Sequence, residues 1–141
     1  MKKVMVFGSF DVLHDGHRSL FEQAKQYGDH LIAVVARDDT YEALRLYTPV
    51  HSEDQRLSVV LKEPFVDTAV LGDRIDIYRA IKQFRPDVIC LGYDQKHFVD
   101  GLDEKLASLG LATSIMRLKP FYPETFKSSL LKKGDGYLPD V

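Results

Sequence analysis

The sequence predicts an α/β fold, with a single doubly wound, five-stranded parallel sheet and helices on both faces. Three observations predict this class. Short apolar runs alternate with amphipathic segments along the chain. The runs are rich in valine, isoleucine and leucine, which is typical of strands that are covered on both faces. Their regular alternation with helical segments favours right-handed crossovers between parallel strands.

Five apolar runs are the predicted strands, and each is short enough to cross a sheet once. Numbered in chain order, they are expected in the Rossmann-like order 3-2-1-4-5, with the first strand beside the point where the order reverses. The predicted strands are Val4–Phe7, Leu31–Ala36, Val66–Leu71, Val88–Leu91 and Thr113–Leu118.

The amphipathic segments between these runs are the predicted helices. Ser52 begins the clearest one, because Ser-Glu-Asp-Gln is a capping box in which Gln55 reaches back to the N-cap. Pro86 and Gly110 are expected to end two others. The predicted helices are Arg18–Tyr27, Ser52–Leu61, Arg74–Phe84, Leu102–Leu109 and Thr125–Lys133.

Length and composition indicate one domain. The chain has 141 residues and a net charge of −2, which argues against a dedicated nucleic-acid-binding protein. Its single cysteine, Cys90, excludes an internal disulfide and a cysteine-rich zinc site. The apolar stretches are too short for a signal peptide or a membrane span, so we expect a soluble cytoplasmic protein without membrane partners. Residues 1–133 are the expected domain, and residues 134–141 a loosely ordered tail.

The segment FGSFDVLHDGH, which begins at residue 7, concentrates polar side chains between the first strand and the first helix. Ligands of doubly wound sheets bind beyond the carboxyl ends of the strands. Gly8 permits close approach of a ligand, and Gly16 is expected to leave helix amides open to an anion. His14 and His17 are expected to point to the same place. Together these residues predict a site for a polyphosphate.

The stretch GSFDVLHDGH resembles the G-T/S-F-D-x-x-H-x-G-H signature of the cytidylyltransferase-like nucleotidyltransferases, and the resemblance covers nearly the whole chain. EDQR is similar to a segment of that family, and ARDDT and LGYDQ are most similar to small archaeal-type FAD synthases. Glycerol-3-phosphate cytidylyltransferase is next in similarity. The resemblance implies transfer of a nucleotidyl group from a nucleoside triphosphate to a phosphorylated small molecule, with ATP as donor and FMN as acceptor.

The resemblance also implies roles for individual residues. His14 and His17 would donate hydrogen bonds to the triphosphate as charge builds on the α-phosphorus, so that catalysis is mostly alignment and charge stabilisation. The main chain at Ser9 and Phe10 would position that phosphate. Mg²⁺ would be held mainly by the nucleotide's phosphates and by water.

Other residues follow the same expected edge of the sheet. Gly92, Tyr93 and Asp94 come after the predicted fourth strand, and the resemblance implies that they frame the base and the ribose. The residues leave two roles open for Asp11, which either assists a metal or accepts from amides of its own turn. Asp15 is an alternative explanation for part of the segment, as an ordinary helix cap.

Arg56 lies in the first turn of a predicted helix, where the helix dipole disfavours a cation. We therefore expect an anion beside it. Glu53 or Asp54 would serve, and so would a bound phosphate, which the family pattern favours.

Two stretches depart from the family pattern. Lys127, Ser128 and Ser129 stand where members carry an Ile-Ser-Thr-Ser/Thr-like string that grips the β- and γ-phosphates. Two roles stay open for the lysine, which either supplies a positive charge for a phosphate or is a solvated helix residue. The segment from Arg37 to His51 offers two arginines but no lysine for an acceptor phosphate. Its apolar side chains suit a flat ring or a partner subunit, and we expect a homodimer.

Other functions stay open. CTP transfer to a polyol phosphate is a second enzymatic interpretation, and Lys127 and the altered segment motivate a third, a nucleotide-binding relative without turnover. Phosphopantetheine adenylyltransferase is disfavoured because its motif normally has one histidine where this one has two. A flavodoxin-like carrier is disfavoured because a flavin phosphate loop needs hydroxyl-rich turns rather than paired histidines.

Overall fold

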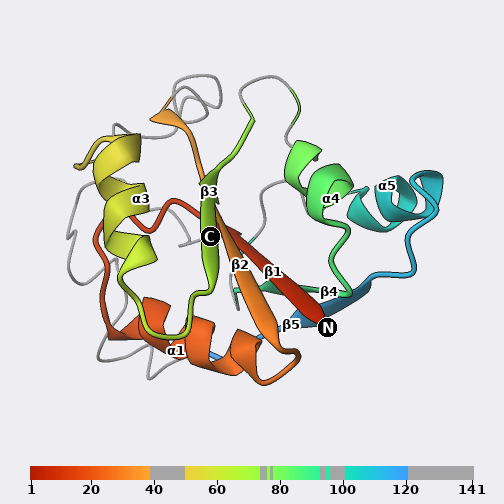
Figure 1. Cartoon of the computed structure of the whole chain (residues 1–141), viewed down its shortest axis with the longest axis horizontal. Helices are drawn as coiled ribbons and strands as arrows, with labels where there is room; N and C mark the ends of the chain where they lie inside the picture. The colour runs from red at the N-terminus through yellow and green to blue at the C-terminus, as the bar shows by residue number, and fades with distance from the viewer. Residues whose placement is uncertain (39–49, 74–75, 77, 93–94, 96–100, 121–141) are drawn as a thin grey trace.

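The computed structural model describes residues 1–38, 50–73, 76, 78–92, 95 and 101–120. These residues form a five-stranded sheet in the order β3-β2-β1-β4-β5, in which every neighbouring pair is parallel (Figure 1). The predicted fold class and strand order are therefore confirmed. The helix predicted over residues 125–133 and the tail predicted after it lie outside the described residues.

The observed strands lie close to the predicted ones, and β4 has the predicted bounds. β3 begins later than predicted, because Asp67 closes the turn before it by exchanging hydrogen bonds with the main chain of Leu31. The strands are β1 (Lys3–Gly8), β2 (His30–Val35), β3 (Thr68–Leu71), β4 (Val88–Leu91) and β5 (Ser114–Arg117).

The observed helices differ more from prediction at their starts. The capping box of Ser52 and Gln55 is confirmed, with both reciprocal hydrogen bonds present. The helix predicted over Arg74–Phe84 begins later than expected, at Arg79, because the carboxylates of Asp73 and Asp76 accept main-chain N–H groups of a turn instead. The helices are α1 (Asp15–Lys25), α3 (Glu53–Leu61), α4 (Arg79–Phe84) and α5 (Leu102–Ser108).

Helices cover both faces of the sheet (Figure 1). Alternate residues of β1 serve the two apolar layers: Val4 and Val6 pack with residues of α1 and α3, and Met5 and Phe7 pack with residues of α4 and α5. Both faces of the central strands are thus filled by core, which explains their continuous apolar sequence. Cys90 belongs to this core, and burial raises the pKa of its thiol to about 12.

The amino edge of the sheet is closed by aspartates. An aspartate comes directly before each of β2, β3 and β4, and each accepts a main-chain N–H from the start of a strand or from the residue before it. The pairs are Lys2 N with Asp29 at 2.9 Å, Lys3 N with Asp87 at 2.8 Å, and Leu31 N with Asp67 at 2.8 Å. These contacts satisfy main-chain donors at the starts of β1 and β2 with carboxylates from other parts of the chain.

The turn between α1 and β2 passes close to the start of β1. A Cβ atom at Gly28 would lie 2.7 Å from both the Lys2 oxygen and the Val4 side chain. Only glycine fits at that distance, so this contact fixes how α1 returns to the sheet.

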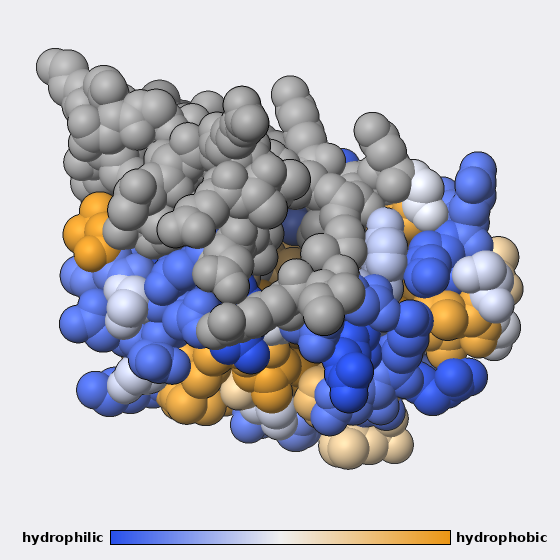
Figure 2. All heavy atoms as spheres, turned by 90° about the horizontal axis from the view of Figure 1, so that it is seen from above, coloured by the Kyte–Doolittle hydropathy of each residue, from blue (hydrophilic) through white to orange (hydrophobic). Residues whose placement is uncertain are grey.

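The described surface in Figure 2 is mostly hydrophilic, with hydrophobic areas between. Several large apolar side chains are exposed at Tyr27, Val50, Val59, Leu61 and Phe65. Among the described residues, no helix has the length and apolar character needed to cross a bilayer.

Candidate active site

The turn that leaves β1 is buried although it carries polar groups. Ser9 and Asp11 are each 2% exposed, and Phe10 between them has a φ of 51°, a left-handed conformation that side-chain-bearing residues rarely adopt. The Phe10 ring packs edge-on against His17, with 5.6 Å between ring centroids, and in a tilted arrangement against Phe21, with 5.2 Å between centroids. This packing offsets a backbone cost of about 1–3 kcal/mol, and such strain is concentrated at functional sites.

His14 and His17 lie together at the start of α1. Their ring centroids are 4.1 Å apart. His14 is the N-cap, and its Nδ1 accepts from the Gly16 N–H at 2.9 Å. The Nδ1 of His17 accepts from the His14 N–H at 3.2 Å. The two histidines therefore form a capping box with each other.

This capping box determines which nitrogen of each ring can donate. A ring nitrogen that accepts a hydrogen bond carries no proton, so in the neutral rings of His14 and His17 the proton lies on Nε2. Both rings are thereby held as Nε2–H donors by the local backbone. A pair of such donors suits an acceptor with several anionic oxygens.

One alternative and one expectation about this helix start are wrong. Asp15 is not the cap, because His14 occupies that position, and the helix therefore begins three residues before the predicted Arg18. The Gly16 amide is not open to an anion, because it donates to His14, and the His17 amide donates to the His14 carbonyl at 3.0 Å. An anion at this site must rely on other donors.

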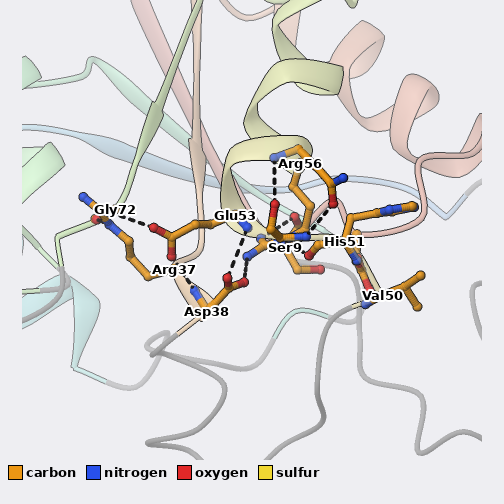
Figure 3. Close-up of polar contacts among 11 residues, drawn as sticks. Ser9, Arg37, Asp38, Val50, His51, Glu53, Arg56 and Gly72 are labelled. Atoms are coloured by element: carbon orange, nitrogen blue, oxygen red, sulfur yellow. Dashed lines mark hydrogen bonds and ion pairs between the residues drawn. The ribbon is translucent and has the colours of Figure 1, made fainter.

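Asp11 holds the chain segment that leads into α3. Its two carboxylate oxygens accept the N–H groups of Val50 at 2.7 Å and His51 at 2.8 Å. Figure 3 shows Val50 and His51 among the polar contacts around Arg56. Of the two roles left open for Asp11, the geometry supports the one in which it holds main-chain amides, although these belong to a distant segment rather than to its own turn.

Arg56 lies at the centre of the polar cluster in Figure 3. Its side chain has no exposed surface. Nη2 forms an ion pair with Asp38 at 2.7 Å. Nη1 donates to the Ser9 oxygen at 3.0 Å and Nε to the His51 oxygen at 3.1 Å. An anion does lie beside Arg56, as expected, but it is Asp38, from the segment that follows β2, and not Glu53 or Asp54.

Glu53 pairs with Arg37 instead, at 2.9 Å. Burial alone raises the pKa of the Glu53 carboxyl, but hydrogen bonds from the Asp38 N–H and from Arg37 outweigh it and hold the pKa below its ordinary value. Arg37 also donates to the Gly72 oxygen at 2.7 Å (Figure 3). Two nitrogens of the Arg37 guanidinium, Nε and Nη1, thus donate to protein groups, which reduces its expected availability for an acceptor phosphate.

The turn after β4 lies next to the turn after β1, because these strands are paired in parallel. Gly92 is buried and its N–H donates to the Gln95 side-chain oxygen at 3.1 Å. Arg117 donates to the main-chain oxygens of both residues at 2.7 Å. Gln95 is 1% exposed, and its Nε2 has no hydrogen-bond partner in the part of the chain that the structure describes. Buried side-chain amides without a hydrogen-bond partner are rare, so the turn after β4 is a candidate binding position.

Sequence reasoning missed three residues of this edge: Asp38, Gln95 and Arg117. Asp38 and Gln95 lie in the ARDDT and LGYDQ segments, which were the available signals, whereas nothing in the sequence singled out Arg117. The remaining predicted residues lie outside the described part of the chain. They are Tyr93, Asp94, Lys127, Ser128 and Ser129.

Comparison with known proteins gives consistent matches. A family profile described as cytidylyltransferase-like matches residues 5–134. The FAD synthase of Aciduliprofundum boonei is 41% identical over 121 residues, which cover 86% of this chain and 80% of the relative. The FAD synthase of Ferroglobus placidus is 40% identical, with 84% and 77% covered.

A solved structure is similar in three dimensions. The crystal structure of the lipopolysaccharide core biosynthesis protein from Thermoplasma volcanium GSS1 superposes with a TM-score of 0.81 and 37% sequence identity. The match covers 86% of this chain and 98% of that chain.

Proposed function

Because the chain belongs to the cytidylyltransferase-like nucleotidyltransferases, we propose that it transfers the adenylyl group of ATP to FMN, forming FAD and releasing pyrophosphate. The family resemblance of GSFDVLHDGH is confirmed by the match over residues 5–134. The choice of ATP and FMN rests on the curated relatives, which are FAD synthases.

The observation that carries the reaction class is the histidine pair. A phosphate oxygen of FMN attacks the α-phosphorus of ATP, and a phosphorus–oxygen bond forms. The bond from the α-phosphorus to the bridging oxygen breaks, and pyrophosphate leaves with its electron pair. Since a phosphate monoester is mostly ionised near neutral pH, the nucleophile needs no strong base.

The protein then contributes hydrogen-bond donors and the alignment of the reacting groups. Nε2 of His14 and of His17 donate to triphosphate oxygens whose charge grows in the transition state, and both donors are pre-oriented by their Nδ1 hydrogen bonds. Gly8 has no side chain, so a phosphate can approach its backbone closely. The main chain of Ser9 and Phe10 positions the α-phosphate there.

Further contacts complete the proposed nucleotide site. Gly92, Tyr93 and Asp94 frame the base and the ribose at the turn after β4. Ser128 and Ser129 bind the β- and γ-phosphates, and Lys127 adds a positive charge there. These assignments derive from the family resemblance and from the position of β4 beside β1.

Magnesium fits this site as part of the nucleotide. Both oxygens of Asp11 already accept main-chain N–H groups, and the described residues contain no cluster of three or more metal-ligating side chains. Phosphates and water are ordinary Mg²⁺ ligands, so the ion arrives with ATP. When bound, it screens repulsion between the phosphate oxygens.

The protein is further proposed to act as a homodimer in the cytoplasm, where ATP is supplied. Exposed apolar side chains at Val59, Leu61 and Phe65 support association of two copies. Light scattering coupled to size-exclusion chromatography tests it, and a mass of one chain would contradict the dimer.

The test of the reaction is a pyrophosphate-release screen that crosses ATP, CTP, GTP and UTP with FMN and glycerol-3-phosphate. We expect release only with ATP and FMN, with one FAD formed for each pyrophosphate. Release with CTP and glycerol-3-phosphate would instead favour the second enzymatic interpretation. Tight nucleotide binding without release would indicate a relative that lacks turnover, and bound flavin without release would indicate a carrier.

A further inference from the structure

Arg56 is the largest fully buried side chain among the described residues. A buried charge is costly unless it is paired and hydrogen-bonded, and the guanidinium meets that need entirely with protein groups (Figure 3). Because its side chain has no exposed surface and its donors face these acceptors, Arg56 acts on the site through the protein rather than by touching a phosphate.

The Ser9 oxygen is the contact that links Arg56 to the proposed phosphate site. A trans peptide unit is planar, and its C=O and N–H point in opposite directions. The described chain has no cis peptide bond. Holding the Ser9 oxygen toward Arg56 at 3.0 Å therefore turns the N–H of Phe10 away from Arg56. A φ of 51° is unfavourable for a residue with a side chain. The chain would therefore not adopt this orientation of the Ser9–Phe10 peptide plane without support.

The far end of this turn, at Asp11, is also held by the segment that leads into α3. The carboxylate of Asp11 accepts from the N–H groups of Val50 and His51, and the His51 oxygen accepts from Arg56. The peptide unit that carries the Phe10 N–H is thus fixed between two anchors at the start of α3.

We propose that Arg56 is a positioning residue, which fixes the Ser9–Phe10 peptide plane so that the Phe10 N–H donates to the nucleotide's phosphate chain in the transition state. This inference rests on the proposed function, since it requires a nucleoside triphosphate. A donor that is aimed in advance needs no reorganisation as charge builds on the phosphate oxygens. The proposal replaces the expected role of Arg56 as a direct phosphate ligand.

Arginine suits this role better than lysine. Three acceptors, on Ser9, Asp38 and His51, surround one flat guanidinium, and each is within 3.1 Å of a different nitrogen. A lysine would keep the charge but has a single nitrogen and a different geometry. Arg56→Lys therefore distinguishes the geometry of the side chain from its charge.

The kinetic test compares Arg56→Met and Arg56→Lys with Val60→Ala. Val60 is a fully buried residue one turn further along α3, in the same apolar cluster as Phe10, and its truncation lowers stability without removing a hydrogen bond to the β1 turn. We expect Arg56→Met to lower kcat by about 100-fold or more, as for loss of one preorganised donor. The KM for ATP should change by less than about threefold. Arg56→Lys should recover only part of the loss.

Three results would overturn the proposal. One is an Arg56→Met enzyme with nearly unchanged kcat. Another is a raised KM for ATP at unchanged kcat, which would mark a direct phosphate ligand. The third is an equal loss of kcat in Val60→Ala at matched thermal stability, which would mean that Arg56 is only structural.

A measurement on the Phe10 amide tests the positioning role without measuring turnover. If Arg56→Met does not fold, Arg56→Lys is measured in its place. We expect the chemical shift and hydrogen exchange of the Phe10 N–H to change much more in the Arg56 variant than in Val60→Ala, which keeps the hydrogen bond from Arg56 to the Ser9 oxygen. An unchanged Phe10 amide contradicts the positioning role. If the wild type forms no FAD from ATP and FMN, the proposed reaction fails, and this amide result still tests Arg56 separately.

Discussion

At the amino edge of the sheet, aspartates before β2, β3 and β4 accept main-chain N–H groups at exposed or partly buried sites. At the carboxyl edge, polar side chains are themselves buried. Every buried polar side chain of the described residues lies at that second edge. They are Ser9, Asp11, His17, Arg56 and Gln95.

The difference shows which edge is built for binding. Aspartates at exposed or partly buried positions are enough to accept main-chain N–H groups at the amino edge. The carboxyl edge instead has a left-handed Phe10, a fully buried Arg56 and a pair of histidines in contact. Such costs are expected where a structure must hold donors in fixed directions for a ligand.

The largest expected effect comes from replacing one histidine at each edge. His17→Ala removes a proposed phosphate donor, so kcat should fall by about 100-fold to 1,000-fold. His30→Ala is the matched control at the amino edge, where the ring contacts Thr68 at 2.7 Å, and its kcat should stay within about twofold of wild type. Near-wild-type pyrophosphate release by His17→Ala would refute the assignment.

A second pair removes an aspartate from each edge. Asp11→Ala leaves the amides of Val50 and His51 without their acceptor, so the free energy of unfolding should fall by about 1–3 kcal/mol and kcat should fall with it. Asp87→Ala removes an exposed acceptor, so a smaller loss of stability and an unchanged kcat are expected. Urea titration and turnover together check this, and full activity in Asp11→Ala would break the comparison.

Gly28→Ala tests whether damage at the amino edge reaches the site. The added Cβ would lie 2.7 Å from the Lys2 oxygen and the Val4 side chain, so we expect a loss of about 1–3 kcal/mol in unfolding free energy. The kcat of the folded enzyme should be unchanged. A large fall in kcat at unchanged thermal stability would show that the two edges are coupled.

The smallest expected effect concerns acid stability. Burial raises the pKa of Asp67, but hydrogen bonds from Lys25 and from the Leu31 N–H outweigh it, so the folded pKa lies below the ordinary value of 3.8. Its stabilisation is present above pH 3.8 and is lost as the pH falls through the lower folded pKa. Asp67→Asn should weaken this part of the pH dependence of unfolding by less than about 1 kcal/mol. An unchanged pH profile would contradict it.

The sequence was most informative where structure depends on local pattern. The apolar runs gave the strands and their order, and the Ser52 capping box gave the start of α3. The start of α1 was missed because histidine is not among the preferred N-cap residues. The start of α4 was missed because carboxylates of Asp73 and Asp76 compete with the helix.

The site was less predictable because its contacts are long-range. The stretch from residue 7 indicated the right edge, and the proximity of His14 and His17 was expected. The partner of Arg56 was missed because Asp38 meets it only through the pairing of β1 with β2 and the packing of α3. No spacing pattern in the sequence predicts the contact between Arg56 and Asp38.

The central claim is that the carboxyl edge binds the triphosphate, and amide-resolved NMR of the wild-type protein during titration with Mg·ATP tests it most directly. The account predicts large, saturable shifts for Gly8, Ser9 and Phe10, and little change for Lys3 and Asp29 at the amino edge. Shifts centred on the amino edge, or no shift in the β1–α1 turn at saturating Mg·ATP, would contradict it.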